Sequence, residues 1–582
     1  MLYSHPRELD WLSLLRHWPR VIRMSSPEIS PSLAVNISQG SRILPMKNSL
    51  FSPFTTRFFL AIWIATLVSN FGMQIHTMAA GWLMLRLDPS PQMVALVQVA
   101  ASLPYMFFAL LAGALSDIYD KRKIMLVAQL FSVSAAAAMA YMTYCELISP
   151  WSLLLFVLLI AIGASFFHPT WAASVREMVP RKYLPEAISL NAINFNLGRS
   201  FAPALGGLLI TVFGIAWAFI LNTLSYLGVV AILWRWKPAA NEEQQDREPV
   251  FWALRVGVGY ALQTDYIRVV ILRILLCSIG AGMFWALMPI IASEHLAGDA
   301  ATFTLLLTGM GLGSVGGGLL ITRARQILGI QRSSVIAQLS MVLCTVGVAL
   351  TDNLIFCTVV ISLLGMSWMI FIANMNVSIQ MSAPAWVVGR MLAIFQSAIL
   401  LGFAAAGLLW GWTATAFGLT ITIVLAAAVI LLSCVYAILK PMLNLDEVST
   451  ENANLPPMAA ERRRTETGKS PIIVTVAYHV THNNTTAFLD SMSRLRAVRL
   501  RLGAVNWSLQ QEIENPERWV ERFVGKNWEE QKRRPKRYSH HDNDIRLQAA
   551  AFDENHAPKY TYMVIRNPER IDNVPFTPLP PV

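Results

Sequence analysis

The stretch Gly113-Ala114-Leu115-Ser116-Asp117-Ile118-Tyr119-Asp120-Lys121-Arg122-Lys123 separates two long apolar runs. A bilayer core of about 30 Å requires about 20 apolar residues for each spanning helix. The charged cluster is too short to form a domain and too charged to face lipid. It therefore predicts a hydrophilic turn between two membrane-spanning helices. An ordinary loop with no role beyond setting topology is the alternative interpretation.

The composition of the whole chain agrees with a membrane protein. Of the 582 residues, 55% are hydrophobic and 14% are charged, whereas soluble proteins average about 25% charged residues. The net charge is +11, and much of it lies after residue 460. A basic balance suits nucleic acid, but beside a membrane it suits an anionic leaflet more simply. We expect the lipid bilayer to be a partner and nucleic acid not to be.

Twelve apolar segments are each long enough to cross a bilayer. They lie near residues 58–85, 92–115, 123–144, 151–168, 189–212, 215–235, 268–292, 301–322, 333–351, 353–374, 391–414 and 417–439. The fold predicted for this part is an all-α membrane protein with twelve transmembrane helices.

The alternating loops differ sharply in basic residues. One set carries clusters such as Lys121 to Lys123 and Arg323 with Arg325, while loops such as 293–300 and 351–353 carry no Lys or Arg. Basic loops stay in the cytoplasm. This predicts a multi-pass protein of the cell (inner) membrane with both termini cytoplasmic.

The segment lengths divide the chain into parts. We predict a disordered extension at 1–50, a six-helix half at 51–236, a cytoplasmic linker at 237–266, a second six-helix half at 267–441, a linker at 442–470, a soluble α+β domain at 471–560 and a tail at 561–582. Met46 directly precedes the first apolar segment, so one hypothesis is that translation starts there rather than at Met1. Two halves joined by a charged linker indicate a duplicated transporter.

The soluble domain is predicted from a change of pattern after Lys440. Residues 472–478 are typical of a strand, 486–502 of an Arg-rich amphipathic helix and 505–513 of a second strand. His479, His482, His540 and His541 have no acid or cysteine at a metal-binding spacing. The five cysteines, Cys145, Cys277, Cys344, Cys357 and Cys434, show no paired or metal-ligand spacing. The sequence therefore predicts no metal, no cofactor and no catalytic site.

The opening stretch resembles the signature loop between the second and third helices of the major facilitator superfamily. Gly113, Leu115, Asp117 and Lys121 to Lys123 fall on that pattern. Ile118 stands where a basic residue is usual, and Asp120 where glycine is usual.

Other stretches resemble the branch that contains the enterobactin exporter and the transmembrane secretion effectors. They include Ser69 to Gly72, Val179 to Pro185, Ser189 to Gly207, Trp285 to Pro289 and Arg499 to Ala504. The resemblance covers most of residues 55–550. It implies a transporter rather than an enzyme, and a tail similar to the ferredoxin-like, dimeric α+β barrel of small monooxygenases, so dimerisation through that domain is an expectation.

The resemblance implies a conformational latch formed by Gly113, Asp117, Lys121, Arg122 and Lys123, which holds one access state. An acid at this place also suits the positive end of a neighbouring helix. For the three basic residues, a purely topological role is the alternative.

A second motif lies in the fifth span. Gly198, Ala202, Pro203, Gly206 and Gly207 follow the spacing of the antiporter signature, although Ala202 and Ser189 replace glycines of that signature. These residues allow helices to approach closely and to bend. Generic close packing explains them equally well.

Polar residues within the apolar segments are candidates for a transport cavity. Arg199 is the strongest, since a charge inside a span costs about 2.5–3.5 kcal/mol and needs a polar environment; snorkelling is the alternative. The further candidates are Asn191, Asn194, His76, Gln74 and Asn374. Hydrogen bonding between helices explains Asn191 and Asn194 as well, and a lone histidine such as His76 is able to relay protons.

The leading hypothesis is a secondary active exporter of small siderophore- or drug-like molecules that works by alternating access, with protons as coupling ion. An uptake carrier or facilitator is the alternative within transport. An anchored regulatory or enzymatic α+β module is the alternative of another class.

Overall fold

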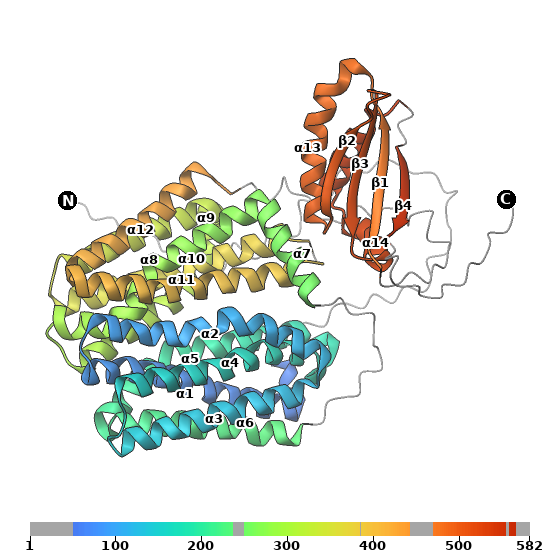
Figure 1. Ribbon diagram of the computed structural model, residues 1–582. Coiled ribbons are helices and arrows are strands. Elements are labelled where there is room, and N and C mark those ends of the chain that lie inside the picture. Colours follow the sequence, from blue (N-terminus) through green and yellow to red (C-terminus); the bar gives the residue numbers. More distant parts are fainter. Residues whose placement is uncertain (1–50, 237–249, 385, 443–469, 555–557, 566–582) are drawn as a thin grey trace, which may run out of the picture. The chain divides into compact units, whose positions relative to one another are not determined.

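The fold is taken from a computed structural model that describes residues 51–236, 250–384, 386–442, 470–554 and 558–565. The predicted extension 1–50, the tail from 566 and most of the two linkers, including the charged run 241–248, lie outside the described residues. Figure 1 shows long helices in the first part of the chain and a sheet covered by helices in the last part.

The first half of the membrane part contains six helices. They are α1 (Arg57–Leu87), α2 (Pro91–Ile118), α3 (Lys121–Tyr144), α4 (Pro150–Met178), α5 (Leu184–Phe213) and α6 (Ile215–Arg235), with short 3-10 turns at Ser52–Thr55 and Arg181–Tyr183. Polar side chains cap several of them, because the first N–H groups of a helix have no partner within it. Ser90 caps α2, Asp120 caps α3 and Ser149 caps α4.

The second half repeats this plan. It contains α8 (Asp265–Ile290), a π-helical turn (Ile291–His295), α9 (Ala300–Ala349), α10 (Leu354–Ser382), α11 (Val388–Phe417) and α12 (Leu419–Leu439). Gly214 joins α5 to α6 with a φ of 89°, and Gly418 joins α11 to α12 with a φ of 84°. Only glycine adopts such a φ without strain, and its recurrence agrees with a duplicated chain.

The number of spans is confirmed in part. Ten described helices are long and apolar enough to cross a membrane. The predicted spans 301–322 and 333–351 both lie in α9, which Gly329 interrupts with a φ of 73°. The predicted span 189–212 lies in α5, in which the described residues include the shorter apolar segment Phe201–Phe213. The count of twelve stays a prediction.

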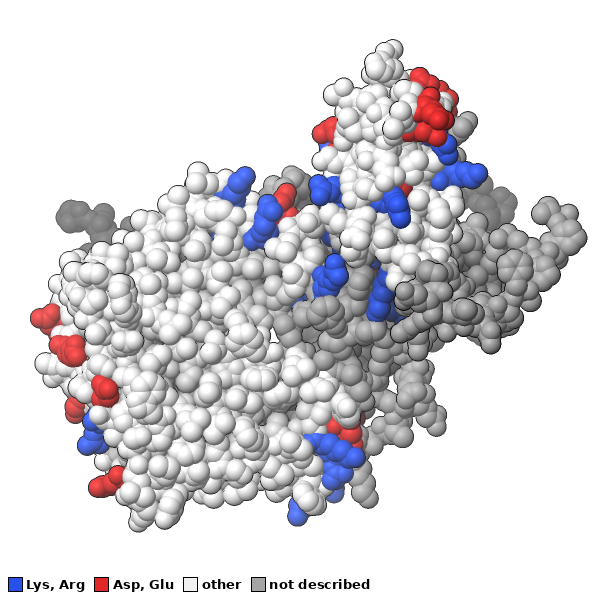
Figure 2. Space-filling view, in the orientation of Figure 1, with Lys and Arg blue, Asp and Glu red and all other residues white. Residues whose placement is uncertain are grey.

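The surface of the helices is that of a lipid-facing protein. Leu319, Leu343 and Ile355 expose 77%, 73% and 76% of their surface, and apolar side chains in such numbers indicate contact with lipid. Figure 2 shows that the visible sides of the helices are largely uncharged and that charged atoms gather at their ends.

The region expected to be only a linker contains an additional helix. Helix α7 (Val250–Gln263) lies within the predicted linker 237–266. The prediction of a linker without secondary structure is therefore wrong for these residues.

The C-terminal part forms the predicted α+β domain. Its elements are β1 (Ile472–His479), α13 (Thr485–Arg501), β2 (Val505–Gln511), β3 (Arg518–Gly525), α14 (Trp528–Arg533), α15 (His540–Ala550) and β4 (Lys559–Val564). The strand order is β2-β3-β1-β4 with every neighbouring pair antiparallel, which is the ferredoxin-like order. Alternate residues of β1 are buried, and they pack with Phe488, Met492 and Leu495 of α13.

Glycines set the distance between α9 and α10. Gly309, Gly313 and Gly317 recur every fourth residue on the face of α9 that meets α10. A Cβ atom on Gly313 would lie 1.8 Å from the carbonyl oxygen of Ser362. Helices in lipid depend on such small residues for close packing.

We predict that Gly313→Ala lowers the unfolding temperature of the detergent-solubilised protein by several degrees. The added methyl group collides with backbone, and overpacking costs about 1–3 kcal/mol. Gly316→Ala is the matched control, because a Cβ atom there meets nothing within 4 Å. Equal unfolding temperatures for the two variants in a thermal scan would contradict the packing described.

Candidate functional site

A cavity lies between the two halves of the membrane part. Its volume is about 120 Å³. The first half lines it with Gln74, Thr77, Met78, Gly81, Val94, Val97, Gln98 and Pro203, and the second half with Trp285, Ala286, Met288, Pro289, Phe303, Leu307, Met310, Gly311 and Ser314. Four of these side chains are polar and uncharged, and the others are apolar. A cavity of this kind holds an apolar molecule and orients it through a few hydrogen bonds.

Aromatic rings form part of the cavity wall. The Trp285 ring stacks on Phe403 with centroids 5.0 Å apart, and it lies 5.5 Å from the ring of Trp368. Trp82 of α1 stacks on Phe303 of α9 at 5.4 Å, so one ring pair joins the two halves beside the cavity.

The two halves meet closely where the loops are poor in basic residues. A Cβ atom on Gly207 of α5 would lie 2.1 Å from the Thr304 side chain of α9. A Cβ atom on Gly407 of α11 would lie 2.6 Å from the Val99 side chain of α2, and Gly411 is equally close to Ala95. All these residues lie near the helix ends that lead to the loops without Lys or Arg.

The hydrophobic core divides toward the other end of the helices. One buried cluster contains residues of both halves, among them Ile75, Ala95, Phe303 and Trp410. A second is built from the first half alone, with Phe59, Met125 and Val175, and a third from the second half and α7, with Ile274, Phe371 and Phe395. The described core is therefore continuous between the halves only at the end with few basic residues.

The predicted latch residues lie at the junction of α2 and α3. Gly113 and Asp117 are in α2, and their side chains lie outside the described residues. Lys121 forms an ion pair with Glu177 of α4. The Arg122 guanidinium donates from Nε to the carbonyl of Leu233 at the end of α6, at 3.1 Å. Lys123 is exposed. The basic residues therefore connect α3 to α4 and α6 within the first half.

The structure gives a reason for Asp120 at a position where the signature loop usually has glycine. It is the N-cap of α3, where its side chain accepts a hydrogen bond of 2.8 Å from the Arg122 backbone N–H. Glycine at this position would offer no such acceptor.

The predicted helix-bending residues of α5 face three different neighbours, namely α1, α9 and the cavity. Gly198 and Gly206 lie against Asn70 and Ile75 of α1, and Gly207 lies against Thr304. Ala202 is buried, and Pro203 lies inside α5 and lines the cavity. At the three glycines the contacts are close approaches between helices.

The candidate cavity residues with described side chains lie in different places. Of these five, Gln74 alone lines the cavity described. Asn194 is buried between α5 and α1, where it accepts from Asn70 at 2.8 Å and donates to the Trp63 carbonyl at 2.9 Å. Asn191 is half-buried in α5, and the Arg199 side chain lies outside the described residues.

His76 and Asn374 also have positions away from the cavity. His76 is buried edge-on against Phe219 of α6, with 5.0 Å between the ring centroids. Neither ring nitrogen has a hydrogen-bond partner among the described residues. Asn374 of α10 accepts a hydrogen bond of 2.8 Å from Nε of Arg325 in α9 and donates to Ser333.

Sequence reasoning did not find the remaining polar residues of the cavity. Thr77 lies three residues after Gln74, and residues at i and i+3 share one face of a helix, so Thr77 lies on the same face of α1. Gln98 and Ser314 gave no comparable signal, because single uncharged polar residues are common in spanning helices. Arg273 was also missed, although it is fully buried in α8 and donates to Gln331 and Gln338.

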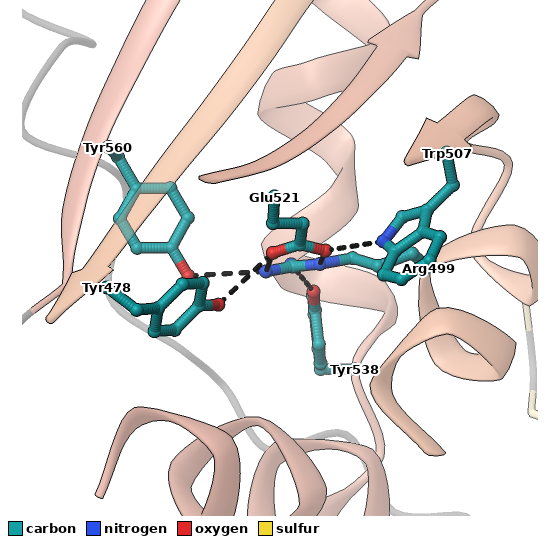
Figure 3. A network of polar contacts seen from close by, with 6 residues as sticks. All are labelled: Tyr478, Arg499, Trp507, Glu521, Tyr538 and Tyr560. Atoms are coloured by element: carbon teal, nitrogen blue, oxygen red, sulfur yellow. Dashed lines mark hydrogen bonds and ion pairs between the residues drawn. The ribbon is translucent and has the colours of Figure 1, made fainter. Parts of the chain in front are cut away.

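The soluble domain contains a buried polar network (Figure 3). Arg499 of α13 and Glu521 of β3 form two hydrogen bonds of 2.8 and 3.0 Å. Tyr478 and Trp507 donate to the same carboxylate, at 3.1 and 2.9 Å. Burial alone would lower the pKa of Arg499, but the adjacent carboxylate outweighs it and raises that pKa. Tyr538 and Tyr560 complete the set around the guanidinium.

Comparison with curated proteins finds transporters. The chain is 25% identical to the uncharacterized MFS-type transporter YkuC of Bacillus subtilis over 293 residues, 47% of this chain and 66% of YkuC. It is 30% identical to the multidrug efflux pump Tap of Mycobacterium tuberculosis over 178 residues, 29% of this chain and 42% of Tap. It is 20% identical to the staphyloferrin A transporter of Staphylococcus aureus, over 53% of this chain and 77% of that protein. The chain thus spans less than two thirds of YkuC and less than half of Tap.

Solved structures with the same fold are also transporters. An inward-facing, unoccupied bacterial homologue of the lysosomal transporter Spinster aligns with a TM-score of 0.52 at 14% identity, covering 66% of this chain and 97% of that one. An auto-inhibited POT-family peptide transporter aligns with a TM-score of 0.54 at 15% identity, covering 67% of this chain and 98% of that one. At such identities the likeness shows the fold alone.

A family model described as "Transmembrane secretion effector" matches residues 48–570, which include both membrane halves and the soluble domain. This family and the relatives named above are transporters rather than enzymes, as the sequence predicted. The chain is therefore a membrane protein that belongs to the transmembrane secretion effector family of the major facilitator superfamily.

Proposed function

We propose that the protein exports small amphipathic molecules across the cell membrane by alternating access. The observation that carries this proposal is the cavity between two halves that touch closely at one end. Transporters built from repeats bind substrate at the interface of the repeats and open it to one side at a time.

The arrangement of the halves supports an opening toward the cytoplasm. The glycine contacts at Gly207, Gly407 and Gly411 lie at the end with few basic residues, and basic loops remain cytoplasmic. In this proposal the halves are closed on the outer side, both termini are cytoplasmic, and substrate enters from within the cell.

The lining of the cavity supports an amphipathic substrate. Two glutamine side chains, Gln74 and Gln98, offer both donors and acceptors, and Met78, Met288 and Met310 are able to adapt to different shapes. No charged side chain among the described residues lines this cavity. The names of two relatives, a multidrug efflux pump and a staphyloferrin A transporter, agree with drug-like or siderophore-like cargo.

Protons are the coupling ion in this proposal. His76 is the titratable candidate in α1; it lies between the cavity residues Gln74 and Thr77 in sequence, and its ring packs against Phe219 of α6. A histidine changes its charge in the physiological range more readily than any other side chain.

Transport in proteoliposomes tests the function directly. We expect an imposed pH gradient to drive uptake of a fluorescent amphipathic dye into inside-out vesicles. Gln74→Ala removes one hydrogen bond to substrate, and a loss of about 1 kcal/mol raises KM roughly five-fold. Gln548→Ala, an exposed residue of α15, is the control. Absence of transport of every dye and siderophore tried, with folded wild-type protein, would overturn the proposal.

The closed end provides a second prediction. Gly207→Val places a side chain where Thr304 lies and so opposes closure, shifting the population toward the outward-open state. We expect faster labelling of Ser314→Cys, a cavity position, by an impermeant maleimide added outside, in a background with Cys145→Ser. Gly228→Val is the control, because nothing lies within 4 Å of a Cβ atom at Gly228. Equal labelling rates in the two variants would contradict this assignment of the closed end.

The latch provides a third prediction. Lys121→Glu and Glu177→Lys each place like charges together, and we expect each to reduce the transport rate several-fold. The double variant restores an opposite pair and should recover most of the rate. Lys123→Glu at the neighbouring exposed position controls for the change of loop charge. A double variant no better than the single ones would leave the ion pair without a role in transport.

A further inference from the structure

Arg534 of the soluble domain is a buried charge without an acid of its own. Only 2% of its surface is exposed. Its three guanidinium nitrogens, Nε, Nη1 and Nη2, all lack a hydrogen-bond partner among the described residues. An unpaired charge is costly to bury, so buried arginines in proteins normally have a partner.

The other buried arginines of this domain do have their acids. Arg499 pairs with Glu521, and Arg537 pairs with Glu530. The half-buried Arg501 pairs with Asp542. The contrast shows that the domain supplies carboxylates to its inner arginines, with Arg534 as the exception within the part of the chain that the structure describes.

The charges around Arg534 do not cancel. Glu530 is the acid whose charge acts on Arg534, and it already pairs with Arg537; the nearby Arg499 is paired with Glu521. Burial lowers the pKa of Arg534 to about 10, so the group is still protonated at neutral pH. The buried cluster therefore carries one uncompensated positive charge, which an anion would neutralise.

The guanidinium lies beside Gly525, whose missing side chain leaves a space of about one methyl group next to it. Arg534 lies over the ring of Phe523, with 4.9 Å between its central carbon and the ring centroid. A Cβ atom on Gly525 would lie 3.9 Å from Nη2 of Arg534 and 3.5 Å from Oε1 of Gln531. The guanidinium and the amide oxygen thus border the same point at the end of β3.

Gln531 has an unsatisfied group of the opposite kind. Its Oε1 atom is buried and has no hydrogen-bond partner among the described residues. A ligand that satisfies both side chains therefore accepts hydrogen bonds at Arg534 and donates one at Gln531. The planar fork of an arginine matches the two oxygens of a carboxylate.

We propose that Arg534 and Gln531, beside Gly525, bind a small organic carboxylate that also carries a hydroxyl or N–H group. The carboxylate lies against the guanidinium, and the hydroxyl or N–H donates to Gln531. This site belongs to the soluble domain and is separate from the cavity of the membrane part.

Saturation-transfer NMR on the full-length protein in detergent micelles tests the site without a transport assay. The probe is glycolate, the simplest 2-hydroxycarboxylate, at neutral pH and constant ionic strength. We expect a clear signal with the wild-type protein and a signal at least about three-fold weaker for acetate, which lacks the donor.

Three variants locate the binding. Arg534→Met removes the charge and should abolish the glycolate signal. Gly525→Ala leaves Arg534 in place but fills the space, and its Cβ atom makes only ordinary contacts with the protein, so it should weaken the signal with an unchanged unfolding temperature. Arg494→Met, an exposed arginine paired with Asp490, should bind glycolate like the wild type.

Several results would overturn the proposal. They are no glycolate signal with the folded wild-type protein, an undiminished signal with Arg534→Met, or an undiminished signal with Gly525→Ala. Equal signals for acetate and glycolate would refute the role of Gln531. Should Arg534→Met fail to fold, Gly525→Ala and the acetate comparison still decide the matter.

Discussion

The arrangement of the membrane part depends on the absence of side chains at a few helix contacts. Lipid removes most of the hydrophobic drive that packs helices in water, so helices in a bilayer associate through close contact and a few hydrogen bonds. Gly207, Gly407 and Gly411 provide that contact between the halves. Thr304, Val99 and Ala95 fill the space that a larger residue would occupy. The joint is formed mainly by apolar surfaces in van der Waals contact.

Within each half, in contrast, polar contacts connect the helices. Arg122 donates to a carbonyl at the end of α6, Lys121 pairs with Glu177, and Arg325 binds Asn374. Separating any of these pairs would break a hydrogen bond or an ion pair between helices of the same half. The contacts between the halves carry no such penalty. Two internally tied halves with a nonpolar joint between them are the physical requirement for a rocking motion in which each half moves as a body.

Sequence reasoning predicted the helices and the soluble domain well, because both depend on long patterns. Apolar runs and charged ends located α1 to α3 and the start of α4 within a few residues, although α4 continues ten residues beyond its predicted end. Alternation located β1, and amphipathic helical periodicity located α13. Position around a helix axis is a finer property. Gln74 lines the cavity whereas Asn194 packs against α1, yet both are single amides in apolar runs. Which one faces the cavity is decided by how α1 and α5 are rotated, and one sequence does not contain that information.

A charge within a span needs a polar environment. The sequence suggests such a site at Arg199, and Arg273 meets the same condition. Arg273 lies in the apolar segment 268–292, and the structure supplies its environment as two amides, Gln331 and Gln338, rather than an acid. The two amide oxygens accept hydrogen bonds from Nη1 and Nη2, while Nε has no partner among the described residues. They leave the charge of the guanidinium in place. A buried arginine thus has two separate needs, hydrogen-bond acceptors and compensating charge, and a protein is able to meet one without the other.

The same distinction applies with more force in the soluble domain. Replacing a buried ion pair by apolar residues is often neutral or stabilising, so a centre built from Arg499, Glu521 and their neighbours is not what stability alone would select. Around Arg499 both needs are met, since Glu521 supplies acceptors and charge together. Around Arg534 neither need is met by the described residues. A domain that gives its other inner arginines a carboxylate has the means to give one to Arg534, and a position left open in such a network is what a binding site for an anion requires.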